Sequence, residues 1–124
     1  MFKINDDKSI YVTRGDAASF VLNLQANGEA YTLKEGEVVR MKVFEKGGCE
    51  CVVIQKDFVA KTPTDSIDIS LDSKDTKIGD TISKPKDYWY EIELNPDTKP
   101  QTIIGYDEDG AKVFRLFPEG GDEN

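Results

Sequence analysis

Apolar and polar residues alternate along several short stretches of the chain, and this two-residue period is typical of half-buried β-strands. The clearest stretch is residues 66–71, where Ile67, Ile69 and Leu71 would share one face. β-Branched and aromatic residues, which suit a pleated and half-buried surface, are frequent in these stretches. The stretches are residues 10–13, 20–25, 39–44, 51–58, 66–71, 88–94, 102–106 and 112–117. The pattern therefore predicts about eight strands.

Turn-forming glycine, asparagine, aspartate and proline residues separate the predicted strands. Gly110 follows an acidic loop between two apolar runs, so we expect it to take a positive φ and close a hairpin. Only residues 72–78 carry a helical signal, with Asp72 or Ser73 as the cap and Gly79 at the end. Short strands joined by tight turns predict an all-β fold, an antiparallel sandwich or barrel with one short helical turn near residues 72–78.

The length of 124 residues fits one domain, with enough buried surface for a core that needs no disulfide or metal. We assign residues 1–118 to a single β-sandwich domain and expect residues 119–124 to be a disordered tail, because the tail has nothing to bury. Cys49 and Cys51 lie too close together for a disulfide framework and lack the further ligands of a zinc site. We therefore expect both to be reduced thiols.

The formal net charge of −8 argues against binding to nucleic acid, whose phosphates need clustered lysine and arginine. No apolar run approaches the roughly 20 residues that span a bilayer, so we expect no membrane contact. Residues 1–8 are polar and acidic and lack the basic and apolar regions of a signal peptide. The sequence thus indicates a protein that is made and kept in a cytoplasm.

The chain contains no histidine, which removes the most common general base near neutral pH and the most common metal ligand. Paired carboxylates can catalyse glycoside hydrolysis, but they need a cleft that raises one pKa, and these acids fall mainly in turns and on outward strand faces. Asp107, Glu108 and Asp109 could offer oxygens to Ca²⁺, as could Asp72 and Asp75, but neither group has the spacing of a calcium loop. We expect no catalysis, no cofactor and no metal, with these acids forming a solvated hairpin tip and a helix cap.

Arg14, Gly15 and Asp16 spell an integrin-type tripeptide. Because the sequence carries no secretory signal, a turn is the simpler interpretation than an adhesive site. We expect this turn to join the first two strands.

Alternation also places large aromatic side chains on the face opposite the core. If the tyrosines of residues 88–94 face inward, Trp89 projects outward beside two glutamates, and Phe44 follows the same logic beside an arginine and a lysine. Outward aromatic residues are candidate anchors of a protein interface, where tryptophan and tyrosine dominate the binding energy. The candidate interface residues are Trp89, Phe44, Arg40, Lys42, Glu91 and Glu93.

Two alternatives concern these six residues. A loop or the N-terminal segment would cover the aromatic side chains if they are structural rather than interfacial. If the two strands are neighbours, Arg40 and Lys42 could pair with Glu91 and Glu93, each exposed pair contributing only about 0.2–1 kcal/mol.

Four motifs follow one another along residues 9–118. They are a Gly-Asp turn that opens the second strand (15–16), a Leu-x-x-x-Asp-Thr segment (71–76), a Tyr-x-Tyr-Glu-Ile strand (88–92) and a closing hairpin through Gly105 and Gly110. In this order the chain resembles the N-terminal β-sandwich domain of phage baseplate upper proteins, which occur in tailed phages and prophages of Gram-positive bacteria.

The resemblance implies an antiparallel immunoglobulin-like β-sandwich of about 7–9 strands, with no catalytic residues to carry over. In that family the domain heads a longer chain with a fibre or receptor-binding region, whereas this chain ends at Asn124. The resemblance therefore implies an adaptor or decoration module of a baseplate or tail. Its partners would be other virion or tail proteins, or further copies of itself in a homo-oligomer. It would lie in the cytoplasm of the host bacterium during assembly and in the virion afterwards.

A carbohydrate-binding β-sandwich module that recognises bacterial surface glycans is the main alternative, because sandwiches often present aromatic residues such as Trp89, Tyr88 and Tyr106 to sugars. That function requires a flat or concave row of exposed aromatic residues, and the sequence places one outward aromatic on the strand of Trp89. A degenerate enzyme or a calcium-dependent adhesin is a third interpretation. It requires the acids of residues 107–109 to converge with others.

Overall fold

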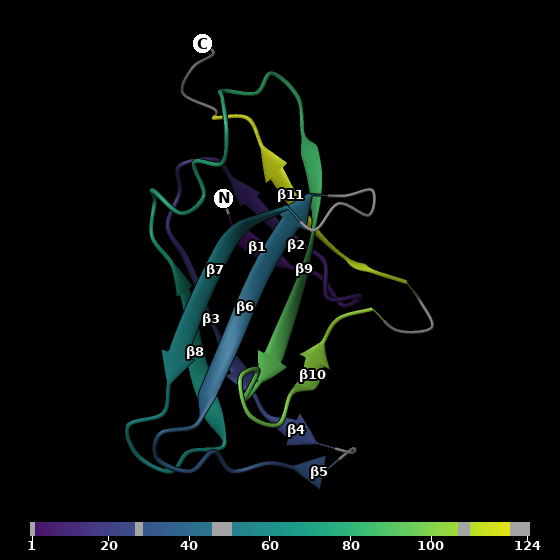
Figure 1. Ribbon diagram of the computed structural model, residues 1–124. Helices are drawn as coiled ribbons and strands as arrows, with labels where there is room; N and C mark the ends of the chain where they lie inside the picture. Colours follow the sequence, from purple (N-terminus) through teal and green to yellow (C-terminus); the bar gives the residue numbers. More distant parts are fainter. Residues whose placement is uncertain (1, 27–28, 46–50, 107–109, 120–124) are drawn as a thin grey trace.

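Strands make up all the regular secondary structure in the computed structural model, which describes residues 2–26, 29–45, 51–106 and 110–119. The prediction of an all-β fold is confirmed for these residues (Figure 1). They form β1 (Phe2–Ile4), β2 (Ile10–Thr13), β3 (Ala18–Asn23), β4 (Gln25–Ala26), β5 (Glu29–Ala30), β6 (Val38–Glu45), β7 (Val52–Val59), β8 (Ser66–Leu71), β9 (Lys86–Leu94), β10 (Gln101–Ile104) and β11 (Lys112–Phe117). No helix in the described part of the chain is long and apolar enough to cross a membrane.

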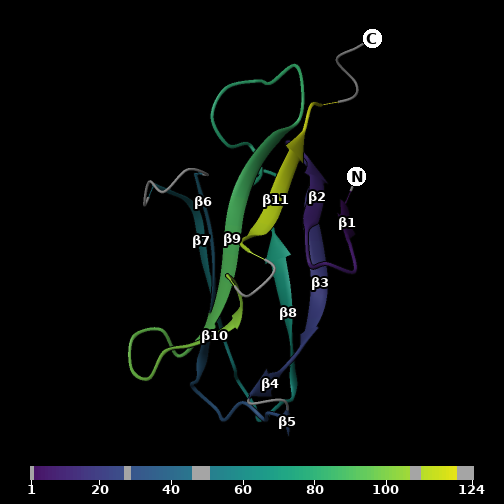
Figure 2. The same cartoon turned by 90° about the vertical axis from the view of Figure 1, so that its right-hand side faces the viewer.

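The strands form two layers, with β3 and β8 packed on one face of a larger sheet (Figures 1 and 2). The larger sheet, called the large sheet below, has the order β1-β2-β11-β9-β6-β7. In it β9 is paired with β11 along its first part and with β10 along its last part. β3 and β8 form a two-stranded sheet, called the small sheet, and β4 and β5 form a short ribbon. The face of the large sheet turned away from the small sheet is its outer face.

One pair of strands departs from the antiparallel arrangement that the sequence predicted. β2 runs parallel to β11, with Ile10 opposite Phe114 and Thr13 opposite Phe117. The other named pairs in the described residues are antiparallel. The prediction of a purely antiparallel fold is therefore wrong at this pair. Alternation along a strand indicates which face is buried, but it carries no information about the neighbouring strand or its direction.

The core lies between the two sheets and follows the predicted alternation. On β9 the side chains of Tyr88, Tyr90, Ile92 and Leu94 are buried, and those between them are half-buried. Ile69 of β8 is fully buried from the opposite layer. The remaining core residues are Ile10, Val12, Leu24, Leu33, Val39, Met41, Val43, Ile54, Ala60, Leu71, Ile78, Phe114 and Leu116.

Residues 72–78 form hydrogen-bonded turns rather than the predicted helical turn. The Asp75 amide donates to the Asp72 carbonyl at 3.0 Å, and the Lys77 amide donates to the Lys74 carbonyl at 3.3 Å. Thr76 is fully buried, and its hydroxyl donates to the Asp16 carbonyl at 2.8 Å while accepting the Gly15 amide at 2.9 Å. These contacts with the β2–β3 turn replace the hydrogen bonds of a helix, so tertiary contacts outweigh the capping signal.

Two further predictions concern residues at the limits of the described chain. Cys51 is disulfide-bonded, so the predicted reduced thiol is wrong at this position, because spacing excluded a framework of bridges but not a single bond. Cys49 and the acidic residues 107–109 lie outside the described residues. Gly110, which follows them, has the predicted positive φ, at 97°.

Candidate interaction surface on the large sheet

The six candidate residues lie together on the outer face, on the neighbouring strands β6 and β9. The strand register pairs Arg40 with Glu93, Lys42 with Glu91 and Phe44 with Trp89. All six side chains are half-buried. The sequence therefore predicted the face correctly, and the register brings all six into one patch.

The aromatic members of the patch contact each other edge to face. The ring centroids of Phe44 and Trp89 are 6.5 Å apart with an interplanar angle of 88°. Val113 of β11 lies opposite Trp89 on the other side of β9. Each ring therefore packs against a neighbour and still presents part of its surface to solvent, as anchors at protein interfaces do.

Arg40 pairs with partners that the sequence did not indicate. Its guanidinium donates to both carboxylate oxygens of Asp57 on β7, at 2.7 and 3.0 Å, and to Asp97 in the β9–β10 turn at 3.0 and 3.2 Å. Glu93, the expected partner across the strand, pairs instead with Lys42 at 3.5 Å. Asp57 lies directly opposite Arg40 on the other neighbouring strand, and its two carboxylate oxygens match two parallel N–H donors of the guanidinium. The hydrogen bonds from Arg40 hold the pKa of Asp57 below its ordinary value.

Glu91 differs from the other charged residues of the patch. The register places it opposite Lys42, but the Lys42 ammonium forms its ion pair with Glu93. Partial burial raises the pKa of Glu91, and the negative charge of Glu93 raises it further, while Lys42 opposes the change. The patch thus holds a carboxylate whose charge is only partly compensated.

A second cluster on the same face was missed by the sequence analysis. Arg115 of β11 donates to both oxygens of Asp87 on β9, at 2.6 and 3.1 Å, and its guanidinium lies over the ring of Tyr11 on β2 at 5.2 Å. The ring of Tyr11 contacts that of Phe117 with centroids 5.4 Å apart. Alternation in residues 10–13 and 112–117 was the available signal, but only the parallel pairing of β2 with β11 brings these side chains together.

The two clusters form one surface across β2, β11, β9 and β6. Trp89 of the first cluster and Asp87 of the second lie two residues apart on the same face of β9, so the two clusters adjoin. Figure 2 shows β9 and β11 towards the viewer, with β6 on their left and β2 on their right. Partly exposed tryptophan, tyrosine and arginine side chains held by neighbours are the residue types that carry most of the energy in protein interfaces.

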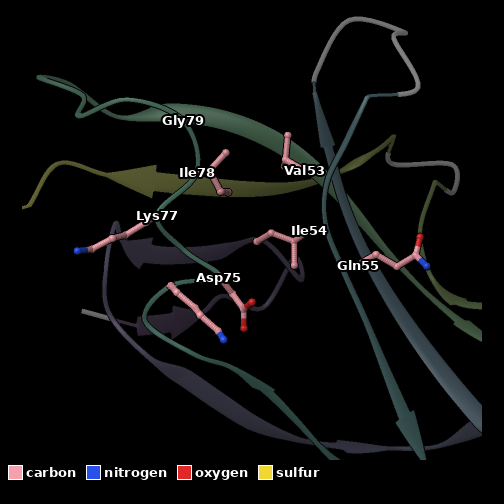
Figure 3. A pocket seen from close by; sticks show the side chains of 8 residues that line it. Val53, Ile54, Gln55, Asp75, Lys77, Ile78 and Gly79 are labelled. Atoms are coloured by element: carbon pink, nitrogen blue, oxygen red, sulfur yellow. The ribbon is translucent and has the colours of Figure 1, made fainter.

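A hollow of about 480 Å³ lies elsewhere, between β7 and residues 74–79 (Figure 3). Ile54 and Asp75 line it, whereas the side chains of Gln55 and Lys77 extend away (Figure 3). Burial raises the pKa of Asp75, but the Asp72 amide at 2.7 Å and the Lys56 ammonium at 3.0 Å outweigh it, so that the pKa is lowered. The acid in this hollow is therefore held as a carboxylate. In the described ranges, no three cysteine, aspartate or glutamate residues gather in an arrangement that fits a metal ion.

The Arg14-Gly15-Asp16 segment forms the predicted turn between β2 and β3. The Asp16 amide donates to the Thr13 carbonyl at 3.0 Å, and Gly15 has a positive φ of 88°. The guanidinium of Arg14 donates to Glu119 at 2.6 Å and to the carbonyl groups of residues 78 and 79. Only 10% of this side chain is exposed, so it ties the turn to neighbouring segments rather than projecting as an adhesive group. Glu119 is the first residue of the predicted disordered tail, and it forms this ion pair with Arg14. The rest of that tail, residues 120–124, lies outside the described residues.

No protein-family model matches this chain, and neither the curated proteins nor the solved structures contain a match.

Proposed function

We propose that this chain is a non-catalytic structural protein of a tailed phage or prophage, an adaptor or decoration module of the baseplate or tail. It acts through protein–protein contacts on the outer face of the large sheet. The observation that carries the proposal is that the Phe44–Trp89 ring pair and the group around Arg115 and Tyr11 lie next to each other on this face. Its partners are other virion or tail proteins.

The strand order supports an immunoglobulin-like sandwich as the finer description of the fold. In variable-type immunoglobulin domains one sheet has the order G-F-C-C′, while strands B and E are neighbours in the other. The order β11-β9-β6-β7 in the large sheet and the pair β3-β8 correspond to these two arrangements in chain order. This agreement supports the resemblance to the sandwich domain of phage baseplate upper proteins.

The chemistry of the molecule favours binding over catalysis. The whole sequence lacks histidine. Among the described acids, Asp57, Asp75 and Asp87 each pair with a lysine or arginine at 2.7, 3.0 and 2.6 Å. The pKa values of Asp57 and Asp75 are lowered, so these two carboxylates are ionised near neutral pH and hold no proton to donate.

Recognition of bacterial surface glycans remains the alternative function, and ring geometry separates the two. A sugar ring stacks on a flat aromatic platform, whereas the rings of Trp89 and Phe44 meet at an interplanar angle of 88° and are each half-buried. The most exposed aromatic residue among those described, Tyr106, is 78% exposed but does not take part in this pair. The arrangement therefore favours insertion into a protein surface.

Binding to isolated tails tests the proposal. The purified protein is mixed with tail particles of the phage or prophage that encodes it, and co-sedimentation is measured for the wild type, Trp89→Ala and the matched control Tyr106→Ala. We expect the wild type and Tyr106→Ala to bind alike and Trp89→Ala to bind at least about tenfold more weakly, because truncation removes the central aromatic anchor. Circular dichroism establishes that each variant keeps its β-structure.

Two results would contradict the proposal. One is the absence of wild-type protein from sedimented tails at all concentrations. The other is saturable binding of purified cell-wall glycan that is lost in Trp89→Ala, which would establish the carbohydrate-binding alternative instead.

A further inference from the structure

Carboxylates outnumber cations at one end of the outer face of the large sheet. This acidic end begins directly beside the Phe44–Trp89 ring pair and extends along β6 and β9 to the β9–β10 turn. The strand register and the ion pairs place two cations and four carboxylates in it, which are Arg40, Lys42, Asp57, Glu91, Glu93 and Asp97. With all six groups ionised, the acidic end carries a charge of −2.

Two carboxylates of the acidic end are more exposed than the cation that they hold. Arg40 exposes 14% of its side chain, whereas its partners Asp57 and Asp97 expose 41% and 73%. A molecule that covers this end therefore meets carboxylate oxygens before it meets the guanidinium. At the other end of the outer face charge is balanced, because Arg115 pairs with Asp87 alone.

Among the described residues, Glu91 is the carboxylate of the acidic end that forms no ion pair. The Lys42 ammonium, which could neutralise it, pairs with Glu93 at 3.5 Å. On the side of β10, Glu91 lies beside Gly105, where an added Cβ would stand 3.9 Å from the Glu91 Oε2 atom. A glycine supplies no side chain to neutralise the charge. Burial, and then the charge of Glu93, raise the pKa of Glu91, as expected for a carboxylate without a close cation.

Trp89 adds a second group that attracts cations. It precedes Glu91 by two residues on the same face of β9, a spacing of about 7 Å along a strand. Its ring is half-buried and meets Phe44 edge to face, so part of the ring is accessible to an incoming group. The face of a tryptophan ring attracts an ammonium or guanidinium within about 6 Å of its centre. One long basic side chain can therefore contact the ring and the carboxylate together.

We propose that Trp89 and Glu91 together receive a lysine or arginine side chain of the protein that covers the outer face, and that the covering surface is basic. The inference rests on the proposed function in taking a protein as the occupant of this face. The net charge of −8 on the chain agrees with it, because such a charge attracts basic partners at long range and repels acidic ones.

Co-sedimentation with isolated tails at several salt concentrations tests the charge of the partner. We expect wild-type binding to weaken as salt is added, because ions screen the attraction between opposite charges. In low salt Glu91→Gln should bind about tenfold more weakly than the wild type, and Glu91→Lys more weakly still. Asp68→Asn is the matched control, since Asp68 is an exposed acid on β8 of the small sheet, and it should bind like the wild type.

A peptide probe separates this inference from the proposed function. A glycine-arginine-glycine peptide, blocked at both ends, is titrated into the full chain, and the same peptide with neutral citrulline in place of arginine is the control. NMR follows the Trp89 indole and the Glu91 carboxyl group. We expect the arginine peptide alone to shift both signals saturably at millimolar concentration. It should also lower the pKa of Glu91, because a bound cation favours the ionised form.

The outcomes distinguish the two proposals. An arginine peptide that shifts neither signal, or that acts no differently from the citrulline peptide, overturns the inference even where the wild type binds tails. Tail binding that is equally tight in Glu91→Gln and independent of salt overturns it as well. A wild type that binds no tails but binds the arginine peptide at Trp89 and Glu91 contradicts the phage assignment and supports the basic-side-chain site.

Discussion

The two sheets of this molecule are built from the same alternating pattern, yet their outer faces differ. On the large sheet, the outward residues Arg40, Lys42 and Phe44 of β6 and Trp89, Glu91 and Glu93 of β9 are half-buried. On the small sheet, the outward residues of β3 are exposed. The difference follows from the number of neighbours: β6 and β9 each have strands on both sides, whereas β3 has β8 alone.

Neighbouring strands, rather than the sequence of one strand, determine which side chains an outward residue contacts. Arg40 reaches Asp57 and Asp97 because β7 and the β9–β10 turn lie beside β6. Val21 lies on a strand that pairs with β8 alone, and 60% of its surface is exposed, although β3 alternates as regularly as β6. The outer face of the large sheet is therefore formed by side chains that pack across strands, whereas the outward side chains of β3 are exposed.

The largest expected effect tests whether the small sheet is stabilised from its inner face alone. Ile69→Ala removes a fully buried side chain of β8 and should lower the free energy of unfolding by about 2–5 kcal/mol. Val21→Ala, on the outer face of β3, should change it by less than about 0.5 kcal/mol. Urea unfolding of both variants gives the two values. Similar losses in the two variants would contradict the contrast between the faces.

A smaller effect concerns the hydrogen bond that ties the large sheet to the N-terminal turn. The buried Tyr90 hydroxyl donates to the Lys8 carbonyl at 2.5 Å. Tyr90→Phe deletes this bond and keeps the ring, so we expect a loss of about 0.5–1.5 kcal/mol in urea unfolding. Tyr106→Phe, at a largely exposed position, is the control and should match the wild type. An unchanged stability in Tyr90→Phe would mean that the bond contributes nothing net.

The smallest effects distinguish two carboxylates on the outer face of the large sheet. Arg40 lowers the pKa of Asp57 from its ordinary value of 3.8, so this group stabilises the fold above that pH, and the contribution is lost as the pH falls through the lowered value. Asp57→Asn should therefore be less stable than the wild type at neutral pH, with the difference shrinking in acid. Melting temperatures measured across this pH range report the change. A constant difference at all pH values would contradict the assignment.

Glu91 should behave in the opposite way. Burial and Glu93 raise its pKa above the ordinary 4.5, so its ionised form destabilises the fold at neutral pH, and protonation relieves this as the pH falls through the raised value. Glu91→Gln should melt slightly higher than the wild type at neutral pH and equal it below the ordinary pKa. Glu93→Gln is the matched control, and it should melt lower at neutral pH because it loses the pair with Lys42.

Much of the large sheet could be predicted from alternation. β2 and β11 have the predicted bounds, and the inward tyrosines of β9 are buried as expected. β1, β4 and β5 were missed because strands of two or three residues are too short to show a period. The predicted helical turn failed because Thr76 finds better hydrogen bonds with the β2–β3 turn than a helix would provide.

The candidate surface could be predicted only in part, and for a related reason. Alternation identified the outward face of β6 and β9, and therefore Trp89 and Phe44. It could not indicate that Arg115 lies beside Tyr11, because those residues meet through the parallel pairing of strands near opposite ends of the sequence. Nor could it indicate the partner of Arg40, since the choice between Glu93 and Asp57 depends on which strand flanks β6.

The parallel pairing also determines how the molecule responds to mechanical load. Force that pulls the chain backwards at Ile10 and forwards at Phe117 drags β2 and β11 past each other along their common axis. The hydrogen bonds between them are then strained together in shear, whereas an antiparallel pair pulled from adjoining ends would unzip one bond at a time. Tension between these two positions would therefore have to break several hydrogen bonds at once.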